Sequence, residues 1–213
     1  MSMPEPIVVL GSGGHAKVII DILQSVGDWE IVGCVSPDQG KSVLGIRVAG
    51  DDSILPHLLK SGVRNAFVAI GDNYLRQKIA NHVQTIGFCL PNAVSPRAIV
   101  SQYVKLGCGI AIMPGAVVNA DTRAEDFAII NTGATVDHDC VIGSWAHIGP
   151  GANLAGEVHV GQGAFIGTGA RVIPKRCIGD WTIVGAGAVV IRDLPAQSVF
   201  AGVPARELRR TSL

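Results

Sequence analysis

His138 stands between two aspartates, Asp137 and Asp139, in a stretch that reads as a turn between two strands. A neutral imidazole there can act as a general base, taking a proton from an attacking amine or hydroxyl. A carboxylate that holds the other ring nitrogen fixes the tautomer and stabilises the imidazolium ion that forms. The spacing does not decide which aspartate does this. The competing interpretation is a solvated polar corner without a catalytic role.

Residues 11–16, Gly-Ser-Gly-Gly-His-Ala, form a glycine-rich segment between an apolar run at 7–10 and a helical pattern at 15–26. Glycines let backbone N–H groups approach an anion, and the N-terminus of the following helix adds a favourable dipole. The segment therefore predicts a phosphate site, against the alternative of a purely structural turn. An NAD site is less well supported, because the second strand ends in Ser36 and Pro37, with Asp38 only beyond them, where an acidic residue should hold the ribose.

The first 90 residues alternate strands with helices. Short apolar runs predict strands at 7–10, 31–35 and 67–70, and patterns that stop at glycine predict helices at 15–26, 54–60 and 74–85. This order is typical of a small parallel α/β sheet with right-handed crossovers, a Rossmann-like βαβ domain at 1–90. Asp72 follows the third strand, where it belongs to a substrate loop or is only the N-cap of the next helix.

Aliphatic residues or alanine recur at every sixth position from Val94 to Val190. This period fits a solenoid of six-residue units, each one short strand and a turn, so a three-sided coil takes about 18 residues. The position four residues later is usually alanine, which a narrow prism requires beside a branched side chain. Glycine often follows the repeat residue directly, where we expect a tight turn. The solenoid is predicted at 91–192, with a polar C-terminal tail at 193–213 as its cap.

Composition argues against several classes of protein. Lys+Arg and Asp+Glu are both 17, so the net charge is zero and no basic excess points to nucleic acid or a membrane surface. No apolar stretch reaches the length of a membrane span, and the N-terminal segment lacks the features of a signal peptide. The five cysteines and six histidines lack metal-ligand spacing. We expect buried free thiols in a cytoplasmic protein, and no metal site.

The hexad pattern [LIV]-[GAED]-x-x-[STAV]-x, together with the segments at 11–17, 131–133 and 137–139, resembles the hexapeptide-repeat sugar O- and N-acyltransferases. The likeness covers essentially the whole chain. It implies a left-handed parallel β-helix after the α/β domain, a homotrimer, and acetyl-CoA in the groove between neighbouring β-helices. Within this family, the motifs are most similar to the nucleotide-aminosugar N-acetyltransferases of bacterial glycan pathways.

The resemblance also implies roles for individual residues. His138 is the expected general base, with Asp139 preferred to Asp137 as its partner. The residues expected to bind the sugar nucleotide, with its diphosphate at the glycine segment, are Gly13, Gly14, His15, Asp72, Asn131 and Asp137. The residues expected to contact acetyl-CoA are His147, Gly156, Thr168 and Ala186. Gly156 lies one coil above His138, where it leaves room for the pantetheine arm or offers an N–H to an oxyanion. Relatives often carry two acidic residues where Ser36 and Pro37 stand, so the base stays open.

These features predict an N-acetyltransferase that uses acetyl-CoA and acts on the 4-amino group of a UDP- or GDP-linked dideoxy-aminosugar. No serine or cysteine nucleophile stands beside a histidine in a helpful motif, so direct attack is favoured over a covalent acyl-enzyme. The first alternative is O-acetylation of a free sugar such as sialic acid, which would leave the glycine segment without a diphosphate. A non-enzymatic β-helix binding scaffold and a carbonic-anhydrase-like β-helix with metal ligands from several subunits are the remaining alternatives.

Overall fold

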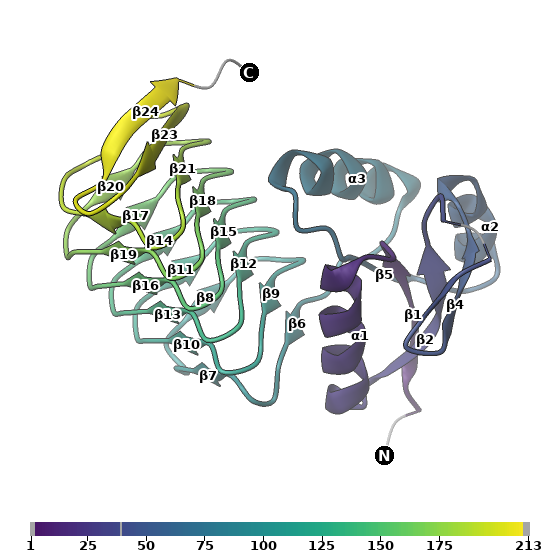
Figure 1. Cartoon of the computed structure of the whole chain (residues 1–213). Helices are drawn as coiled ribbons and strands as arrows, with labels where there is room; N and C mark the ends of the chain where they lie inside the picture. The colour runs from purple at the N-terminus through teal and green to yellow at the C-terminus, as the bar shows by residue number, and fades with distance from the viewer. Residues whose placement is uncertain (1–2, 39, 211–213) are drawn as a thin grey trace. The chain divides into compact units, whose positions relative to one another are not determined.

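The computed structural model describes residues 3–38 and 40–210 of the chain. It divides into two compact units, Met1–Pro96 and Arg97–Leu213 (Figure 1). The predicted domains at 1–90 and 193–213 each include a few residues outside the described set. The first unit is an α/β domain, and the second consists of stacked short strands.

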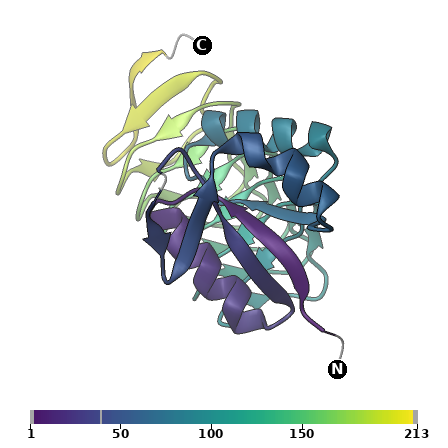
Figure 2. The same cartoon turned by 90° about the vertical axis from the view of Figure 1, so that its right-hand side faces the viewer.

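The first unit is built on a five-stranded sheet of order β3-β4-β2-β1-β5, parallel except for the pairing of β3 with β4. Figure 2 turns these strands toward the viewer. Its strands are β1 (Glu5–Leu10), β2 (Trp29–Val35), β3 (Ser42–Val43), β4 (Ile46–Gly50) and β5 (Asn65–Val68). Its helices are α1 (Gly14–Val26), the 3₁₀ turn η1 (Asp52–Ile54), α2 (Leu55–Lys60) and α3 (Asn73–Ile86). The three predicted strands and three predicted helices are confirmed, with small shifts at their ends.

Helix α1 forms because apolar residues recur on one face at helical spacing. Ile19, Ile22 and Leu23 are buried, and the helix packs against β1 and β2. It ends at Gly27, which takes the left-handed conformation and donates its N–H to the carbonyl of Leu23. Since β1, β2, β4 and β5 are parallel, their carboxyl ends meet at one edge of the sheet, which is where ligands bind in folds of this kind.

Strands β3 and β4 are missing from the elements predicted from sequence. They form a hairpin whose two turn residues, Leu44 and Gly45, both have positive φ angles, 49° and 83°. Such two-residue turns usually carry asparagine or aspartate before the glycine, and leucine gives no such signal. The hairpin brings β4 beside β2, which extends the carboxyl edge of the sheet by one strand.

The strands of the second unit, with β6 just before it, form the three sides of a prism. Side one has the order β22-β19-β16-β13-β10-β7, side two β20-β17-β14-β11-β8, and side three β24-β23-β21-β18-β15-β12-β9-β6. All pairings from β7 to β22 are parallel, and paired residues lie one coil, 18 residues, apart. The two-residue strands are β6 (Ala93–Val94), β7 (Ile99–Val100), β8 (Lys105–Leu106), β9 (Ala111–Ile112), β10 (Val117–Val118), β11 (Arg123–Ala124), β12 (Ile129–Ile130), β13 (Thr135–Val136), β14 (Val141–Ile142), β15 (His147–Ile148), β16 (Asn153–Leu154), β17 (His159–Val160), β18 (Phe165–Ile166), β19 (Arg171–Val172), β20 (Cys177–Ile178), β21 (Ile183–Val184) and β22 (Val189–Val190).

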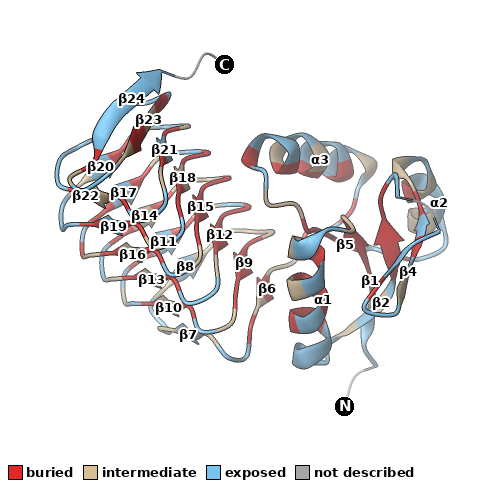
Figure 3. Ribbon diagram, viewed as in Figure 1, coloured by how far each residue is buried: buried red, intermediate tan, exposed pale blue. Residues whose placement is uncertain are grey.

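The repeat residues fill the interior of this prism, as the hexad pattern predicts. Ile130, Ile148 and Ile166 are fully buried on successive coils, and Figure 3 shows the same pattern of burial along the stacked strands. The alanines four positions after repeat residues, Ala134 and Ala152 for example, are also fully buried. A branched side chain and a methyl group therefore alternate in a space too narrow for two large side chains.

The glycines that follow repeat residues have a different purpose from the tight turn that we expect from sequence. A Cβ atom on Gly149 would lie 2.5 Å from the carbonyl oxygen of Ile166, and one on Gly143 would lie 2.8 Å from the backbone of Gln162. These positions are glycine because the next coil stacks directly on them. The left-handed corner falls two residues later, at Gly151 (φ 63°) and at Trp145 (φ 65°).

The C-terminal segment is more ordered than the polar tail predicted at 193–213. It forms β23 (Ser198–Ala201), which pairs in parallel with β21, and β24 (Arg206–Arg210), which pairs with β23 in antiparallel fashion. Strand β23 thus continues side three, and β24 turns back at its end (Figure 1). Every residue of β24 is exposed, which explains why its sequence lacks the apolar alternation that would have revealed a strand.

Candidate active site

His138 lies at the corner between β13 on side one and β14 on side two. The next residue, Asp139, has a φ angle of 58°, so the chain takes its left-handed corner there. This turn brings the Asp139 carboxylate 2.8 Å from Nδ1 of the imidazole. Nδ1 therefore donates its proton to Asp139, and the lone pair of the neutral ring is on Nε2.

The electrostatics of the corner suit a proton acceptor. The hydrogen bond to Asp139 is the largest cause that raises the pKa of His138, and Asp137, Asp139 and Glu157 add to it through their charges. The ring is exposed, so a reactant can reach Nε2. A basic, oriented and accessible imidazole is what general base catalysis requires.

Asp137 has a different place in the same corner. Its carboxylate accepts a hydrogen bond from the Asn119 side chain at 2.9 Å and another from the backbone N–H of His138 at 2.9 Å. These two donors lower the pKa of Asp137. Sequence left open which aspartate holds the imidazole, and in the structure the carboxylate on the ring is that of Asp139. Asp137 fixes the backbone of the corner instead.

Gly156 lies one coil above His138, as its spacing predicts. A Cβ atom at this position would be 2.6 Å from both Cε1 and Nε2 of the His138 ring. The imidazole is therefore packed directly against the glycine backbone. In the same column, the residues one coil below His138 and one coil above Gly156 are Ala120 and Pro174, so glycine occurs only where the ring needs the space.

His147 and Asn131 are joined by a hydrogen bond. Their Nε2 and Nδ2 atoms lie 2.9 Å apart, while Oδ1 of Asn131 accepts from the backbone N–H of Thr132 at 2.7 Å. Since Oδ1 is identified by that second bond, the other atom is an NH₂ donor, and Nε2 of His147 must accept. The neutral ring then carries its proton on Nδ1. His147 is only 8 % exposed, so it is not an ordinary surface histidine.

The predicted site residues of the β-helix fall into two groups on different edges of the prism. His138, Asp139 and Gly156 lie at the edge between sides one and two. Asn131, Thr168 and Ala186 lie at the edge between sides three and one, and His147 lies on side three. The second group is in register, since Thr168 and Ala186 occupy equivalent exposed positions one coil apart. One copy of the chain does not bring the two groups to one edge.

Two hollows flank the His138 corner. One, of about 500 Å³, is lined by Asp139 and residues of the coils above it on side two, including Glu157 and Lys175. The other, of about 580 Å³, runs along side one and is lined by Asp137, Asn153 and Arg171 among others. The corner is thus a ridge with a polar hollow on one side and a largely apolar hollow on the other.

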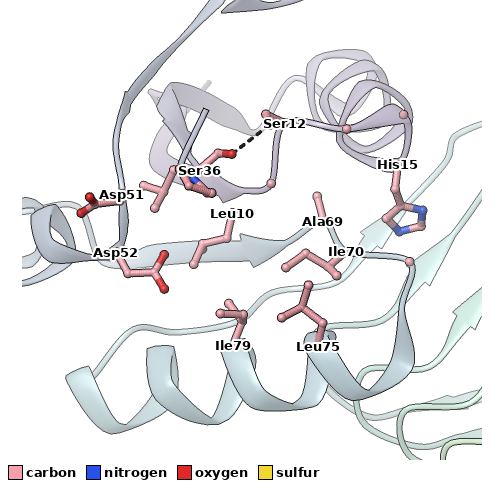
Figure 4. Close-up of a pocket in the computed structure, with 16 residues that line it drawn as sticks. Leu10, Ser12, His15, Ser36, Asp51, Asp52, Ala69, Ile70, Leu75 and Ile79 are labelled. Atoms are coloured by element: carbon pink, nitrogen blue, oxygen red, sulfur yellow. Dashed lines mark hydrogen bonds between the residues drawn. The ribbon is translucent and has the colours of Figure 1, made fainter. Parts of the chain in front are cut away.

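A third cavity, of about 670 Å³, opens at the carboxyl edge of the sheet in the first unit (Figure 4). The glycine segment forms part of its lining, with Gly13 as the N-cap of α1. At Gly11, whose φ angle is 126°, a Cβ atom would lie 2.7 Å from the carbonyl oxygen of Ala69. The segment is therefore pressed against the end of β5, which leaves the N-terminus of α1 facing the cavity, where it favours an anion.

Residues Ser12, Ser36 and Asp38 tie the glycine segment to the loop after β2. The Ser12 hydroxyl donates to Asp38 at 2.9 Å and lies 2.8 Å from the Ser36 hydroxyl, which must donate to it. Ser36 is 7 % exposed. Ser36 thus has a structural partner in the glycine segment, and no local pattern in the sequence marks Ser12 or Asp38 for this contact.

His15 lines the cavity from the first turn of α1. Burial, and then the charge of Arg76, lower the pKa of His15 to about 4. Arg76 is 1 % exposed and donates to the carbonyls of Ile70 and Gly71, both at 3.1 Å, and to Asn73 at 2.8 Å. It therefore fixes the loop after β5. At helical spacing Arg76 shares the buried face of α3 with Ala80 and Val83, and no local pattern indicates that carbonyls of the preceding loop will pair with its charge.

Asp72 caps α3, because its carboxylate accepts from the N–H of Leu75 at 2.8 Å. The N-cap alternative is thus observed, and Gly71 rather than Asp72 lines the cavity. The cavity lining also includes Asp51 and Asp52, which no motif in the sequence marks as site residues. They follow β4, the strand that was not predicted, so their place at the sheet edge could not be foreseen.

The described residues contain no cluster of three or more histidine, cysteine or acidic side chains arranged to hold a metal ion. Among residues 3–38 and 40–210, no helix is long and apolar enough to cross a membrane. Cys34 and Cys140 are buried as predicted, whereas Cys89 and Cys177 are exposed and Cys108 is only partly covered. The expectation of buried thiols is therefore wrong for these three residues. Cys108 is not inward-facing because it stands at a corner, two residues after its repeat residue, whereas Cys140 stands four residues after its own.

Comparison with known proteins adds to this geometry. Residues 6–83 match the family model described as the PglD N-terminal domain. PerB from Caulobacter crescentus, in complex with CoA and GDP-perosamine, is 51 % identical, with a TM-score of 0.93 over 96 % of this chain and 97 % of that one. The acetyltransferase domain of PglB from Neisseria gonorrhoeae is 36 % identical, with a TM-score of 0.92 over 96 % and 100 %. WeeI from Acinetobacter baumannii is 26 % identical, with a TM-score of 0.88 over the same shares.

Among curated proteins, the uncharacterized protein L142 of Acanthamoeba polyphaga mimivirus is 32 % identical over 124 residues, which are 58 % of this chain. The match spans only 24 % of the length of that protein.

A small α/β unit joined to a hexad β-helix with an oriented histidine at its corner defines a hexapeptide-repeat acyltransferase. Half of the residues are identical to those of an N-acetyltransferase over nearly the full length of both chains. The chain belongs to the family of hexapeptide-repeat nucleotide-aminosugar N-acetyltransferases, with a PglD-type N-terminal domain and a left-handed parallel β-helix. The family and fold class predicted from the sequence are thereby confirmed.

Proposed function

We propose that this protein transfers the acetyl group of acetyl-CoA to the 4-amino group of a GDP-linked 4-amino-4,6-dideoxy sugar of the perosamine type. The observation that carries the proposal is the 51 % identity, over 96 % of the chain, to a perosamine N-acetyltransferase whose structure holds CoA and GDP-perosamine. The PglB domain, which has been solved with acetyl coenzyme A, supports the same cosubstrate.

In the proposed reaction, the sugar amine attacks the thioester carbonyl and a tetrahedral intermediate forms. Nε2 of His138 takes the proton that the amine loses, and Asp139 holds the resulting imidazolium at 2.8 Å. When the C–S bond breaks, the CoA thiolate leaves and recovers that proton. The backbone N–H of Gly156, which has no hydrogen-bond acceptor among the described residues, is the proposed donor to the oxyanion.

The α/β unit supplies the nucleotide site. We propose that the N–H groups around Gly13 and Gly14 bind the diphosphate, with the neutral His15 beside it. A neutral imidazole can donate one N–H and contributes no charge that would slow product release. Asp72 and Asp137 are engaged as a helix cap and as a corner support. Their predicted contacts with substrate remain predictions.

The proposed assembly is a homotrimer with active sites between subunits. His138 lies at one edge of the prism, while Asn131, Thr168 and Ala186 lie at another. Placing two prisms side by side brings unlike edges together, so acetyl-CoA could contact the second edge of one subunit and His138 of its neighbour. His147 is the proposed contact of the thioester or an adjacent amide of CoA. A cytoplasmic location follows from the proposal, because acetyl-CoA and sugar nucleotides are cytoplasmic metabolites.

The direct test is release of CoA thiol from acetyl-CoA in the presence of GDP-, UDP- or dTDP-linked 4-aminosugars or free sialic acid. We expect turnover with GDP-perosamine, and a decrease of about 10²- to 10⁴-fold in kcat for His138→Ala. The matched control is His82→Ala, which removes an exposed histidine of α3 that lines none of these cavities and should keep full activity. Turnover only with a free sugar would replace the proposal with O-acetylation.

The trimer is tested by mixing two inactive variants. His138→Ala removes the base, and Ala186→Glu blocks the proposed cofactor edge. If each site is formed by two subunits, random mixed trimers regain about a quarter of the sites, because a native His138 meets a native Ala186 with that probability. No recovery in coexpressed, correctly assembled mixtures would show that each subunit carries a complete site.

A further inference from the structure

The cavity of the first unit has a polar end that the diphosphate does not use. The glycine segment follows β1, whereas Asp51 and Asp52 follow β4, and β2 lies between these strands in the sheet. Neighbouring strands are about 4.8 Å apart, so the two ends of the cavity are separated by about 10 Å. That span accommodates a ribose and a purine between the phosphates and the far edge of the base.

The walls between these two ends are largely apolar, and the hydroxyl of Ser36, which also lines the cavity, is hydrogen-bonded to Ser12. Leu10, Ile70, Leu75 and Ile79 line the cavity, and Figure 4 shows their side chains grouped between the glycine segment and Asp52. Apolar walls hold a flat base by contact with its two faces, and they cannot distinguish one base from another. Selection of a base therefore requires polar groups at the end of the cavity.

The two aspartates at that end are not equivalent. The Asp51 carboxylate caps η1 by accepting from the N–H of Ser53 at 3.0 Å, and in Figure 4 it is turned away from the apolar side chains. The Asp52 carboxylate is turned toward Leu10 and the interior of the cavity. It makes no hydrogen bond or ion pair with the part of the chain that the structure describes. The two carboxylate oxygens of Asp52 are thus available as hydrogen-bond acceptors for a ligand.

The geometry points to Asp52 as the residue that selects guanine. A carboxylate has two parallel acceptors, and guanine presents two parallel donors, N1–H and the 2-amino group. Uracil and thymine offer a single N–H between two carbonyl oxygens, which would face the second carboxylate oxygen with like charge. Adenine has an acceptor, N1, beside its amino group. This inference rests on the proposed function, since it explains how a GDP-linked sugar is chosen.

The test is binding of GDP, inosine diphosphate, xanthosine diphosphate and UDP to the full chain by calorimetry. Inosine diphosphate lacks the 2-amino group, so it should bind about 10- to 100-fold more weakly than GDP to the unmodified protein. In Asp52→Ala the difference in affinity between the two nucleotides should fall to less than about threefold, because the carboxylate that would accept from the 2-amino group of GDP is absent. The matched control is Asp28→Asn, which makes the same change of charge at an exposed residue just before β2, at the opposite edge of the sheet.

Asp52→Asn gives a test that misfolding cannot imitate. An asparagine offers one acceptor and one donor, which match N1–H and the 2-oxo group of xanthine. This variant should therefore prefer xanthosine diphosphate to GDP, the reverse of the unmodified protein. An unchanged preference for GDP over inosine diphosphate in Asp52→Ala, or no reversal in Asp52→Asn, would overturn the inference.

These outcomes are distinguishable from failure of the proposed function. If the unmodified protein neither binds GDP nor acetylates GDP-perosamine, the proposed function fails and the role of Asp52 fails with it. If it does both, and the Asp52 variants keep the original order of nucleotides, only the assignment of Asp52 is wrong.

Discussion

Replacing Gly156 with alanine should impair catalysis while leaving the fold intact. The added Cβ would lie 2.6 Å from Nε2 and Cε1 of His138, against at least 3.4 Å for an ordinary contact, so the ring must retreat by about 0.8 Å. It can do so easily, because it is an exposed side chain, but Nε2 and the 2.8 Å bond to Asp139 then move with it. A displacement of about 1 Å at a reacting group costs about 10²-fold in rate.

The assay is steady-state acetyl transfer with thermal unfolding measured in parallel. We expect kcat/KM to fall about 10²-fold in Gly156→Ala, with little change in Tm. Introduced into His138→Ala, the same substitution should have almost no further effect, because the ring that it displaces is already absent. This double-mutant comparison separates displacement of the base from loss of cofactor space.

Two results would refute the reasoning. Wild-type kcat/KM in Gly156→Ala would show that the position of the ring does not matter. An equally large loss in the His138→Ala background would show that Gly156 acts on acetyl-CoA or on the oxyanion and not through the imidazole.

Three further predictions concern neighbouring groups. Activity should rise with pH as His138, whose pKa is raised, loses its proton. Because Asp139→Asn removes the largest cause of that shift, the rising limb of its kcat/KM profile should move to lower pH, and an unmoved limb would show that another group causes the rise. The pKa of His15 is lowered to about 4, so folding disfavours its protonation, and the free energy of unfolding should fall by about 3 kcal/mol between pH 6.5 and pH 4. Denaturant titration of His15→Gln should not show this loss. Asn131→Ala frees the tautomer of His147, so KM for acetyl-CoA should rise about 10-fold with kcat little changed, whereas a rise in KM for the sugar nucleotide would show direct contact with the acceptor.

The hexad period alone predicts the β-helix, because each six-residue unit makes its own corner and its own contribution to the interior. Such contacts repeat at fixed spacing along the chain, so a linear pattern contains them. The alternation of strands and helices predicts the α/β unit for the same reason, since burial of one face leaves a period in the sequence. The hairpin β3–β4 and the strand β24 leave no such period. One depends on an unusual turn at Leu44, and the other is exposed along its whole length.

The candidate site divides in the same way. The sequence alone indicates His138 and the glycine segment as site residues, because the residue types that their chemistry requires are adjacent in the chain. It also places Gly156 in the coil above, since register in a solenoid is fixed by residue number.

Only the tertiary structure decides the orientation of the groups. It shows that Asp139 and not Asp137 holds the imidazole, because the left-handed corner at φ 58° turns one carboxylate to the ring. It also buries Arg76 behind the loop after β5 and turns Asp52 into the cavity. The partners of Asp139 and Arg76 are near in sequence, but the rotamers that join them to these partners leave no trace in a one-dimensional pattern. The other lining of the cavity at Asp52 comes from segments distant in sequence, which only folding brings together.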